Sequence, residues 1–302
     1  MTRVDRPDYL RETPRFDRSG VGMRWTNRWR LQIVDLFCGR GGVGYAIANC
    51  PAPIDPWMHA GFDVEDYSET YPGKFAQRDL LHDPSLDDLA RAVDVPIVPS
   101  GRSILVDAGV VDDPYGLPDL HGLTADVVWA SFPCTAYSSL SATYYGSRDA
   151  ALEANPRITD EFRKLLLNIA PHYVIENVPG ATRVGDLDAN VRVNGLAFDG
   201  LNFDLERHFE TTFPCPDAYL DGEPEVTIDT RDDQSIAALA DAKGVPRTWG
   251  KQGVRSAIPW QYVYWVLHHC PAFPGPAPKR TEQMLVPQMQ NALGVDERIC
   301  SR

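Results

Sequence analysis

Apolar, β-branched runs alternate with segments of helical periodicity along the middle of the chain. Short runs dominated by apolar, β-branched residues predict strands at 32–36, 126–129 and 173–175. The segment Asp160–Ile169 instead predicts an amphipathic helix. Its apolar residues lie on one face: Phe162, Leu165, Leu166 and Ile169. Buried strands joined by helices are typical of an α/β domain with a mainly parallel sheet, in which ligands bind at the carboxyl ends of the strands.

Two of these strands end next to residues that carry chemistry. Cys134 follows the strand at 126–129, and Glu176 follows the strand at 173–175. Because the carboxyl ends of parallel strands meet at one edge of a sheet, the thiol and the carboxyl could face one planar substrate from the same side. This pair suits covalent chemistry on a ring, with a nucleophile and an acid that protonates what the nucleophile polarises. Each residue alone also fits a structural role, the cysteine as a small buried hydrophobe and the glutamate as a cap.

The first predicted strand runs into a glycine-rich turn. Gly39, Gly41 and Gly44 have the G-x-G-x-x-G spacing of dinucleotide-binding turns, and a helix is predicted from Gly44 to Ala48. Such a turn lets a cofactor approach the backbone, and the helix N-terminus offers free N–H groups. A nicotinamide-dependent enzyme is therefore one interpretation. Against it, Asp35 is placed to take an amino-acid ammonium group, and hydride transfer does not need the downstream nucleophile.

Three motifs in a fixed order make the chain resemble a known family. They are Asp35-Leu36-Phe37-Cys38-Gly39-x-Gly41-Gly42, then Pro133-Cys134, then Glu176-Asn177-Val178. In this order they resemble the cytosine-C5 DNA methyltransferases, most of all the small phage-type members. The likeness extends over about residues 31–267. It implies a Rossmann-like fold that binds S-adenosylmethionine, with a mostly parallel sheet flanked by helices and a small target-recognition lobe.

The resemblance assigns roles to the residues at matching positions. The catalytic residues are Cys134, Glu176, Arg207 and Asn177. The residues expected at the cofactor are Asp35, Phe37, Gly39, Gly41, Gly42, Glu65, Asp66, Asp79, Pro133, Arg255 and Ser256. Among the acids, Glu65 or Asp66 would take the ribose hydroxyls at the end of the second strand, and Asp79 would take the adenine amino group.

The implied reaction is a methyl transfer to cytosine. Cys134 attacks C6 of the base, Glu176 contacts N4 and protonates N3, and Arg207 holds O2. C5 then takes the methyl group on a base that is flipped out or already unpaired. The residues 138–149 are rich in Ser, Tyr and Gly, and we expect them to form a mobile loop that closes over the base.

The chain departs from the family pattern at three places. Phe132 replaces the first proline of Pro-Pro-Cys, and Leu205 replaces the first arginine of Arg-x-Arg. Ser256, with Arg255 beside it, stands where the family has a small polar residue at the cofactor. A cation there could accept an extra carboxylate, so a second hypothesis is a carboxy-S-adenosylmethionine donor and a 5-carboxymethylcytosine product. Cytosine in RNA is another alternative, and a catalytically silent cofactor-binding module that docks a protein is an alternative of a different class.

The resemblance divides the chain into five parts. They are an Arg-rich N-terminal extension at 1–30, a catalytic and cofactor-binding domain at 31–207 with an insertion at about 82–125, a short target-recognition region at 208–250, a C-terminal motif at 251–270 that packs back on the cofactor site, and a Pro-rich linker with a tail helix at 271–302.

Composition changes this picture in one respect, the charge. The net charge is −13, with 42 acidic and 29 basic residues, whereas a DNA-binding protein is expected to present a basic surface. DNA binding would then depend on local basic patches such as residues 1–30, and we do not expect specific recognition of a long duplex sequence.

No apolar run approaches the ~20 residues that span a bilayer, and the cysteines form no CxxC pair. We expect a cytoplasmic monomer (in the host cytoplasm if phage-encoded) that binds DNA, without a metal or a membrane.

Overall fold

The computed structural model describes residues 32–49, 59–81, 125–201, 203–224 and 233–273. These residues form a seven-stranded sheet with the order β3-β2-β1-β4-β5-β7-β6. The strands are β1 (Ile33–Leu36), β2 (His59–Asp63), β3 (Lys74–Gln77), β4 (Val127–Ser131), β5 (His172–Asn177), β6 (Val191–Val193) and β7 (Arg207–Thr211). Every pair is parallel except those of β7, which runs antiparallel to β5 and β6. The expected mainly parallel sheet flanked by helices is confirmed, and the fold is a Rossmann-like α/β fold.

The strand order locates the place where a ligand can bind. From β1 the chain first builds outward through β2 and β3, and then returns to place β4 on the other side of β1. In open α/β sheets, the crevice beyond the carboxyl ends of the strands at such a reversal is the usual binding site. The glycine turn follows β1, and the segment with Cys134 follows β4. Both motifs therefore lie at the point where the strand order reverses.

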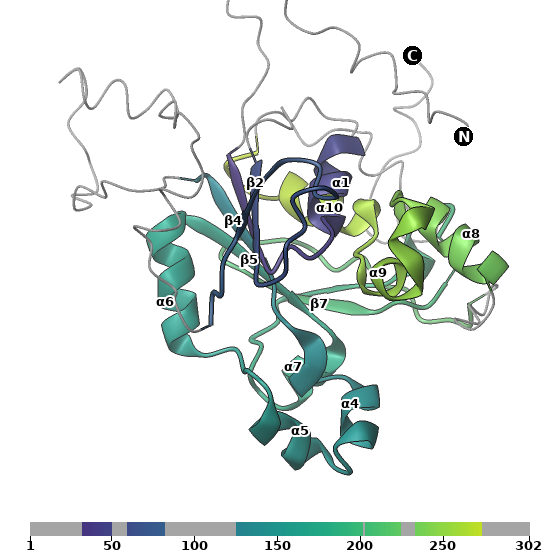
Figure 1. The fold of residues 1–302 in the computed structure, drawn as a ribbon, viewed down its shortest axis with the longest axis horizontal. Helices are drawn as coiled ribbons and strands as arrows, with labels where there is room; N and C mark the ends of the chain where they lie inside the picture. The colour runs from purple at the N-terminus through teal and green to yellow at the C-terminus, as the bar shows by residue number, and fades with distance from the viewer. Residues whose placement is uncertain (1–31, 50–58, 82–124, 202, 225–232, 274–302) are drawn as a thin grey trace, which may run out of the picture.

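Helices cover both faces of the sheet (Figure 1). On one face lie α1 (Gly42–Asn49) and α10 (Trp260–His268), and on the other lies α6 (Asp160–Ile169). The prediction of a helix over Asp160–Ile169 is confirmed. Thr159 caps it by accepting a hydrogen bond from the backbone of Phe162, and acidic residues occupy its first turn, where they complement the helix dipole.

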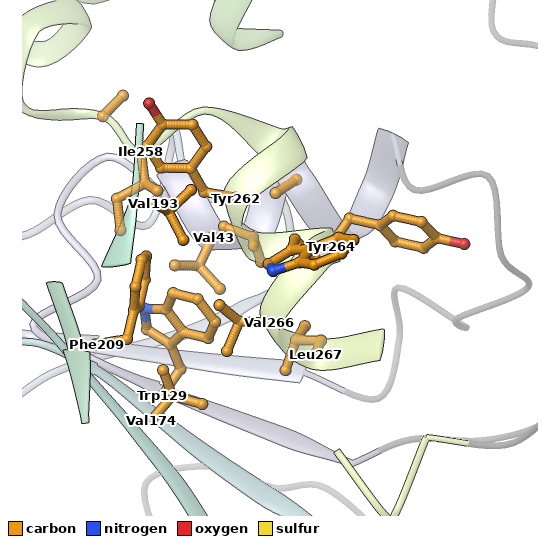
Figure 2. Packing of buried hydrophobic residues seen from close by; sticks show 14 of the residues in the cluster. Val43, Trp129, Val174, Val193, Phe209, Ile258, Tyr262, Tyr264, Val266 and Leu267 are labelled. Carbon is orange, nitrogen blue, oxygen red and sulfur yellow. The ribbon is translucent and has the colours of Figure 1, made fainter. Parts of the chain in front are cut away.

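The larger core lies between the sheet and the pair α1 and α10. Figure 2 shows Trp129 of β4 and Phe209 of β7 beside Val266 of α10, with Val43 of α1 close by. The ring centroids of Trp129 and Phe209 are 5.8 Å apart. Burial of one such side chain contributes about 2–3 kcal/mol, so this layer fixes β4 and β7 relative to one another. The strand ends that carry the candidate chemistry are thus held on a rigid base.

The expectation of a loop over residues 138–149 is wrong. This segment forms α4 (Ser139–Tyr144) and the start of α5 (Arg148–Ala154). The serines that made the sequence look loop-like are helix caps, because Ser138 and Ser147 accept hydrogen bonds from the backbone N–H groups of Ser141 and Ala150. Figure 1 places α4, α5 and α7 (Pro179–Arg183) together at one end of the molecule.

The region expected to recognise the target is part of the main fold. A boundary between residues 207 and 208 falls inside β7, and α8 (Asp233–Lys243) and α9 (Gly250–Ser256) follow it. Buried residues from 208–250 belong to the same core as α1 and α10: Phe209, Phe213, Cys215, Ala218, Ile236, Leu239, Ala240, Val245 and Trp249. The described part of this region therefore shares its core with the domain that carries the candidate site.

Several sequence predictions lie outside the described residues. They are the N-terminal extension at 1–30, nearly all of the insertion at 82–125, and the tail helix within 271–302. Within the described ranges, no helix is both long and apolar enough to cross a membrane.

Candidate active site

The two candidate catalytic strands end side by side. β4 and β5 are parallel neighbours, and Ser131 at the end of β4 pairs in register with Glu176. Cys134 opens a short 3-10 helix (Cys134–Ala136) just beyond β4. The Cys134 residue is exposed, whereas Glu176 is only 7% exposed. The sheet therefore brings the predicted nucleophile and acid to one edge, with the nucleophile on the accessible side.

Arg207 completes this group. It is the first residue of β7, the strand antiparallel to β5, and its Nε lies 2.9 Å from Oε1 of Glu176. Burial raises the pKa of Glu176, while the charges of Arg207 and Lys243 and hydrogen bonds from Ser131 and Arg207 act in the opposite direction. The net direction is upward, so the carboxyl holds its proton at a higher pH than a free glutamate. A carboxyl with this property can act as a general acid.

The Cys134 thiol responds to the same charges. Desolvation is the main cause that raises its pKa, although the residue as a whole is exposed. The Glu176 carboxylate raises the pKa further, and Arg207 lowers it. The thiol is therefore harder to ionise than a free cysteine, and the charge of Glu176 adds to this effect.

Asn177 has a positioning role in this structure. Its side-chain N–H donates to the carbonyl oxygen of Phe132 at 2.9 Å, and its Oδ1 accepts from the backbone of Val178 at 2.9 Å. The residue is 1% exposed. It ties the end of β5 to the segment that leads through Pro133 to Cys134, and so sets the position of the nucleophile.

The glycine turn after β1 is open on one side and tightly packed on the other. Phe37, Gly39 and Gly41 have positive φ angles of 56°, 52° and 97°. A Cβ added at Gly39 would meet nothing within 4 Å, whereas one at Gly41 would lie 2.6 Å from Pro72. Phe37 packs edge-on against Phe132, with ring centroids 5.1 Å apart. The open side of the turn lets a ligand approach its backbone, and Phe37 joins the turn to the segment before Cys134.

Asp35 lies beneath this turn and does not face solvent. It is 0% exposed, and Tyr71 donates a hydrogen bond from its hydroxyl to Oδ2 at 3.1 Å. Within the described residues, Oδ1 has no hydrogen-bond partner. Burial raises the pKa of Asp35 well above its ordinary value, and the nearby charge of Asp63 adds to the increase. The Tyr71 ring lies so close to Gly61 that a Cβ there would be 2.4 Å from its Cζ.

The acid nearest to the turn is one that sequence reasoning missed. Asp63 is the last residue of β2, and its Oδ2 accepts a hydrogen bond from the backbone of Gly39 at 2.9 Å. Glu65 and Asp66 lie beyond the strand end and are exposed, with Glu65 accepting from the Tyr67 hydroxyl at 2.6 Å. The signal that could have identified Asp63 is its position as the last residue of β2, at the carboxyl edge of the sheet.

The third acid assigned to the cofactor follows the next strand. Asp79 lies two residues after β3 and is half-buried. Its Oδ1 accepts a hydrogen bond from the backbone of Leu81 at 3.2 Å. β3 is the parallel neighbour of β2, so Asp79 and Asp63 follow adjacent strands at the same edge of the sheet.

The C-terminal segment reaches the turn from the other side. A Cβ at Gly42 would lie 3.2 Å from the backbone N of Ile258 and 3.5 Å from Cα of Ala257, so the end of α9 contacts the glycine turn. Arg255 and Ser256 in the last turn of α9 are exposed. The Ser256 hydroxyl donates to the carbonyl oxygen of Gln252 at 2.9 Å.

A second residue that the sequence did not reveal is Lys243. It ends α8 and is 1% exposed, and its Nζ donates to the carbonyl oxygens of Val254, Arg255 and Ala257 at 2.9, 3.0 and 2.6 Å. Desolvation lowers its pKa well below the ordinary value, the charge of Arg207 lowers it further, and Glu176 opposes both. In the sequence, a lone lysine near a helix end gives no sign of burial.

The chemistry of the turn fits an adenosyl cofactor. The turn offers open backbone at Gly39, carboxyls of Asp63 and Asp79 follow adjacent parallel strands, and the buried Asp35 carboxyl keeps an oxygen that no described residue bonds. No cluster of three or more potential metal ligands occurs in the ranges that the structure describes.

Comparisons with known proteins give structural neighbours only. No family model and no curated protein sequence matches the chain. One solved structure that it resembles is a putative DNA modification methyltransferase encoded within a prophage (E. coli), with 14% identity and a TM-score of 0.27 over 60% of this chain and 46% of that one. Another is the S. pombe Dnmt2 methyltransferase, with 14% identity and a TM-score of 0.29 over 60% of this chain and 49% of that one. A third is the Entamoeba histolytica methyltransferase EhMeth, with 13% identity and a TM-score of 0.33 over 68% of this chain and 64% of that one. The matched part thus spans about half to under two thirds of each neighbour. We base the chemistry on the site residues.

Proposed function

We propose that this protein transfers a methyl group from S-adenosylmethionine to C5 of cytosine in DNA through a covalent Cys134 intermediate. The observation that carries the proposal is the group formed by Cys134, Glu176 and Arg207 at neighbouring strand ends. Glu176 is buried, held by Arg207 at 2.9 Å, and electrostatically coupled to the Cys134 thiol. A nucleophile and a buried acid with a raised pKa are what addition to a cytosine ring requires.

The first half of the reaction activates the base. Cys134, which is exposed, gives its proton to a base in the solvent, and its sulfur forms a bond to C6 while the electron pair of the C5–C6 double bond moves into the ring. Glu176 gives its proton to N3, so that no full negative charge builds up on the ring. Arg207 keeps the carboxyl in place and would contact O2 of the base. C5 is then nucleophilic.

The second half transfers the methyl group and releases the enzyme. S-adenosylmethionine, held at the glycine turn and near Asp63, would supply the electrophilic methyl group: C5 takes it up as the bond from this methyl group to the sulfonium sulfur breaks, and S-adenosylhomocysteine is left. The C5 proton then leaves to a base, its electron pair restores the C5–C6 double bond, and the Cys134 sulfur departs from C6. Glu176 takes back the N3 proton, and the ring is aromatic again. Asn177 keeps the Cys134 segment at the end of β5 throughout.

The substrate base must leave a duplex or be unpaired to reach Cys134. The helix α4 begins five residues after Cys134, and its residues Leu140 and Tyr144 are 67% and 84% exposed. Exposed aromatic and aliphatic side chains suit contact with unstacked bases. We therefore propose these two side chains as contacts for a nucleic-acid substrate, in spite of the acidic composition.

The decisive experiment is mass spectrometry of nucleosides from DNA incubated with the full-length protein and S-adenosylmethionine. We expect 5-methyldeoxycytidine with the wild type and with Cys270→Ala, and none with Cys134→Ala. DNA containing 5-fluorocytosine should form a stable protein adduct at Cys134, because the fluorine at C5 cannot leave as a proton does. Methyl groups on N4, or product from Cys134→Ala, would refute the covalent mechanism, and product only from RNA would change the substrate.

A second candidate is carboxymethyl transfer from a carboxylated donor. The observation that favours it is Arg255, an exposed guanidinium in α9, whose end contacts the glycine turn through Ala257. Arg255→Met should abolish a preference for carboxy-S-adenosylmethionine in competition with S-adenosylmethionine and leave methyl transfer in place. Equal use of the two donors by the wild type and by Arg255→Met would exclude this candidate.

A further inference from the structure

The contact between Arg207 and Glu176 lies at the very end of the ladder that joins their strands. The antiparallel pairing of β5 with β7 stops at Asn177 and His208, so Arg207 lies one residue past the last pair. On its other side it pairs with Val193 of β6, the short strand at the edge of the sheet. The ladder with β5 thus ends before Arg207, and side-chain contacts are needed to hold the guanidinium against the carboxyl.

His208 makes such contacts on the opposite face of the sheet. Side chains alternate along an extended chain, so His208 and Glu206 point away from the face that carries Arg207. The His208 side chain is 11% exposed, and both ring nitrogens are bonded. Nε2 lies 2.7 Å from Oε1 of Glu206, and Nδ1 lies 2.8 Å from the hydroxyl of Thr182 in α7. The ring therefore bridges the residue before Arg207 to the helix that follows Glu176.

The chemistry of this bridge determines which atoms carry hydrogen. A carboxylate only accepts hydrogen bonds, so Nε2–H of His208 donates to Glu206. In the neutral ring, Nδ1 then accepts from the Thr182 hydroxyl, and in the protonated ring Nδ1–H donates to the same oxygen. The bridge holds in both forms of the histidine, so it is a fixed support and not a pH switch.

The bridge reaches the guanidinium through Glu206. The carbonyl oxygen of Glu206 accepts a hydrogen bond from Nη1 of Arg207 at 2.9 Å, while Nε of the same guanidinium lies 2.9 Å from Oε1 of Glu176. Because His208 holds the Glu206 side chain, it restricts the rotation of the residue whose carbonyl binds the guanidinium.

The residue before Glu206 is held by another helix. The hydroxyl of Tyr262 in α10 donates to the carbonyl oxygen of Leu205 at 2.7 Å. The two residues that lead into Arg207 are therefore each tied to a helix, Leu205 to α10 and Glu206, through His208, to α7.

His208 also has a counterpart across the ladder. It pairs in register with Asn177, whose side chain holds the Phe132 carbonyl and hence the segment before Cys134. Two paired residues thus support two parts of the candidate site. Asn177 supports the segment of the nucleophile, and His208 supports the segment of Arg207.

We propose that His208 is a positioning residue for Arg207: through its bridge from Thr182 to Glu206, it holds the guanidinium on the Glu176 carboxyl. The purpose of that position, the contact of Arg207 with O2 of cytosine, rests on the proposed function. The positioning itself rests on the hydrogen bonds that run from α7 to Glu176. Loss of the bridge should therefore loosen the ion pair more than it loosens the sheet.

The test follows the guanidinium directly and does not need turnover. In the full-length protein, NMR measures how fast the Nε–H proton of Arg207 exchanges with solvent, and the signal is assigned by its loss in Arg207→Met. His208→Phe removes both ring nitrogens, and Thr182→Val removes only the hydroxyl. His172→Phe is the matched control, because His172 begins β5 at the end opposite to Glu176.

We expect the Arg207 proton to exchange about tenfold faster in His208→Phe and about threefold faster in Thr182→Val, since the first loses a charge-assisted hydrogen bond and the second a neutral one. The backbone N–H groups of β7 should change less than this proton, and His172→Phe should alter neither. Equal acceleration of the backbone and the Arg207 proton would reduce His208 to a structural role and overturn the proposal. An unchanged Arg207 proton would overturn it as well.

If His208→Phe does not fold, Thr182→Val decides. Thr182 is half-buried, and valine keeps the shape of its side chain while the hydroxyl that contacts Nδ1 is lost. Faster exchange of the Arg207 proton in this variant sustains the proposal, and exchange at the wild-type rate overturns it.

Kinetics separate this proposal from the proposed function. If methyl transfer to DNA occurs, His208→Phe should lower kcat/KM for DNA about tenfold and leave KM for S-adenosylmethionine unchanged, because Arg207 acts on the base. A raised KM for the cofactor with an unchanged kcat/KM for DNA would overturn the proposal. Faster exchange of the Arg207 proton in a protein that transfers no methyl group would sustain the positioning role and refute the proposed function.

Discussion

Nε of Arg207 and Oε1 of Glu176 are 2.9 Å apart, and this contact joins β7 to β5 at the edge of the sheet where Cys134 lies. Both side chains are largely buried. The pair therefore stabilises the fold and also controls the proton that the proposed reaction uses.

Removal of the arginine should destabilise the protein in a pH-dependent way. Arg207→Met leaves the Glu176 carboxylate buried without its partner, which costs about 3 kcal/mol where the carboxyl is ionised. The pKa of Glu176 is already raised, and loss of Arg207 raises it further, so stability is retained at low pH and lost as the pH rises through this pKa. Urea unfolding should show a larger deficit at pH 8 than at pH 5.

An exposed ion pair provides the control for that measurement. Arg192 and Asp217 lie 3.0 Å apart on the surface, and Arg192→Met should change stability by less than about 1 kcal/mol at both pH values. A deficit for Arg207→Met that is independent of pH would contradict the link to Glu176 ionisation.

The rate at which iodoacetamide alkylates Cys134 should depend on the charges of Glu176 and Arg207. Because the pKa of the thiol is raised, the rate should be low at pH 7 and climb with pH. Glu176→Gln removes a negative charge and should accelerate the reaction at pH 8 about threefold or more, whereas Arg207→Met should slow it. Peptide mapping by mass spectrometry identifies the labelled residue. Rapid labelling of the buried Cys38, Cys215 or Cys270 would show that the protein had opened.

Substitutions in the glycine turn and in β2 should separate packing from binding. Gly61→Ala places a Cβ 2.4 Å from Tyr71 and 2.8 Å from the Cys38 sulfur, and should cost about 2–3 kcal/mol. Tyr71→Leu added to it should recover part of that loss.

Gly39→Ala should affect ligand binding more than stability. The added methyl group meets no atom within 4 Å, so the cost to stability is only the strain of the positive φ, about 1–2 kcal/mol, but the methyl group would lie on the open side of the turn. Calorimetry should show that it weakens cofactor binding more than its effect on thermal unfolding explains.

Asp35→Asn should flatten the pH dependence of stability. In the wild type the pKa of Asp35 is raised, so its contribution to stability is present at low pH and declines as the pH rises toward that pKa. The amide keeps an oxygen for the Tyr71 hydroxyl but carries no charge, so the variant should gain about 1 kcal/mol on the wild type between pH 4.5 and pH 8. Guanidinium unfolding at the two pH values measures the gain, and Asp66→Asn at an exposed site should show none. Parallel curves for the wild type and Asp35→Asn would contradict the buried, neutral state.

The sequence predicted those parts of the fold where pattern and packing agree. Apolar patterns correctly placed the strand that leads to Cys134, the strand that contains Glu176, and the helix Asp160–Ile169. Each of them buries its apolar residues in the core. For residues 138–149 the sequence pattern predicted a loop, and the structure has helices there instead. Ser and Gly are typical of loops, but two of these serines cap helices, and only the three-dimensional path of the chain shows which use applies.

The site was predictable to the extent that its residues follow strand ends. Asp63 was missed because no run of apolar residues marks the end of β2, so the strand was expected to end two or three residues later, at Glu65 or Asp66. Lys243 was missed for another reason. Its surroundings are carbonyl groups of a helix that begins seven residues later and charges on two strands, none of which is local in sequence.

Under the proposed function, the packing of β7, α8 and α9 against the sheet that carries the candidate site limits how this protein could acquire a new target sequence. The stretch from 207 to 256 begins with Arg207, includes Lys243 and ends beside the glycine turn. A recognition segment exchanged as a cassette between relatives would carry parts of the catalytic and cofactor machinery with it. Under the proposed function, specificity in the described part of this stretch would change most readily by point substitutions on its surface, because its buried residues are shared with the candidate site.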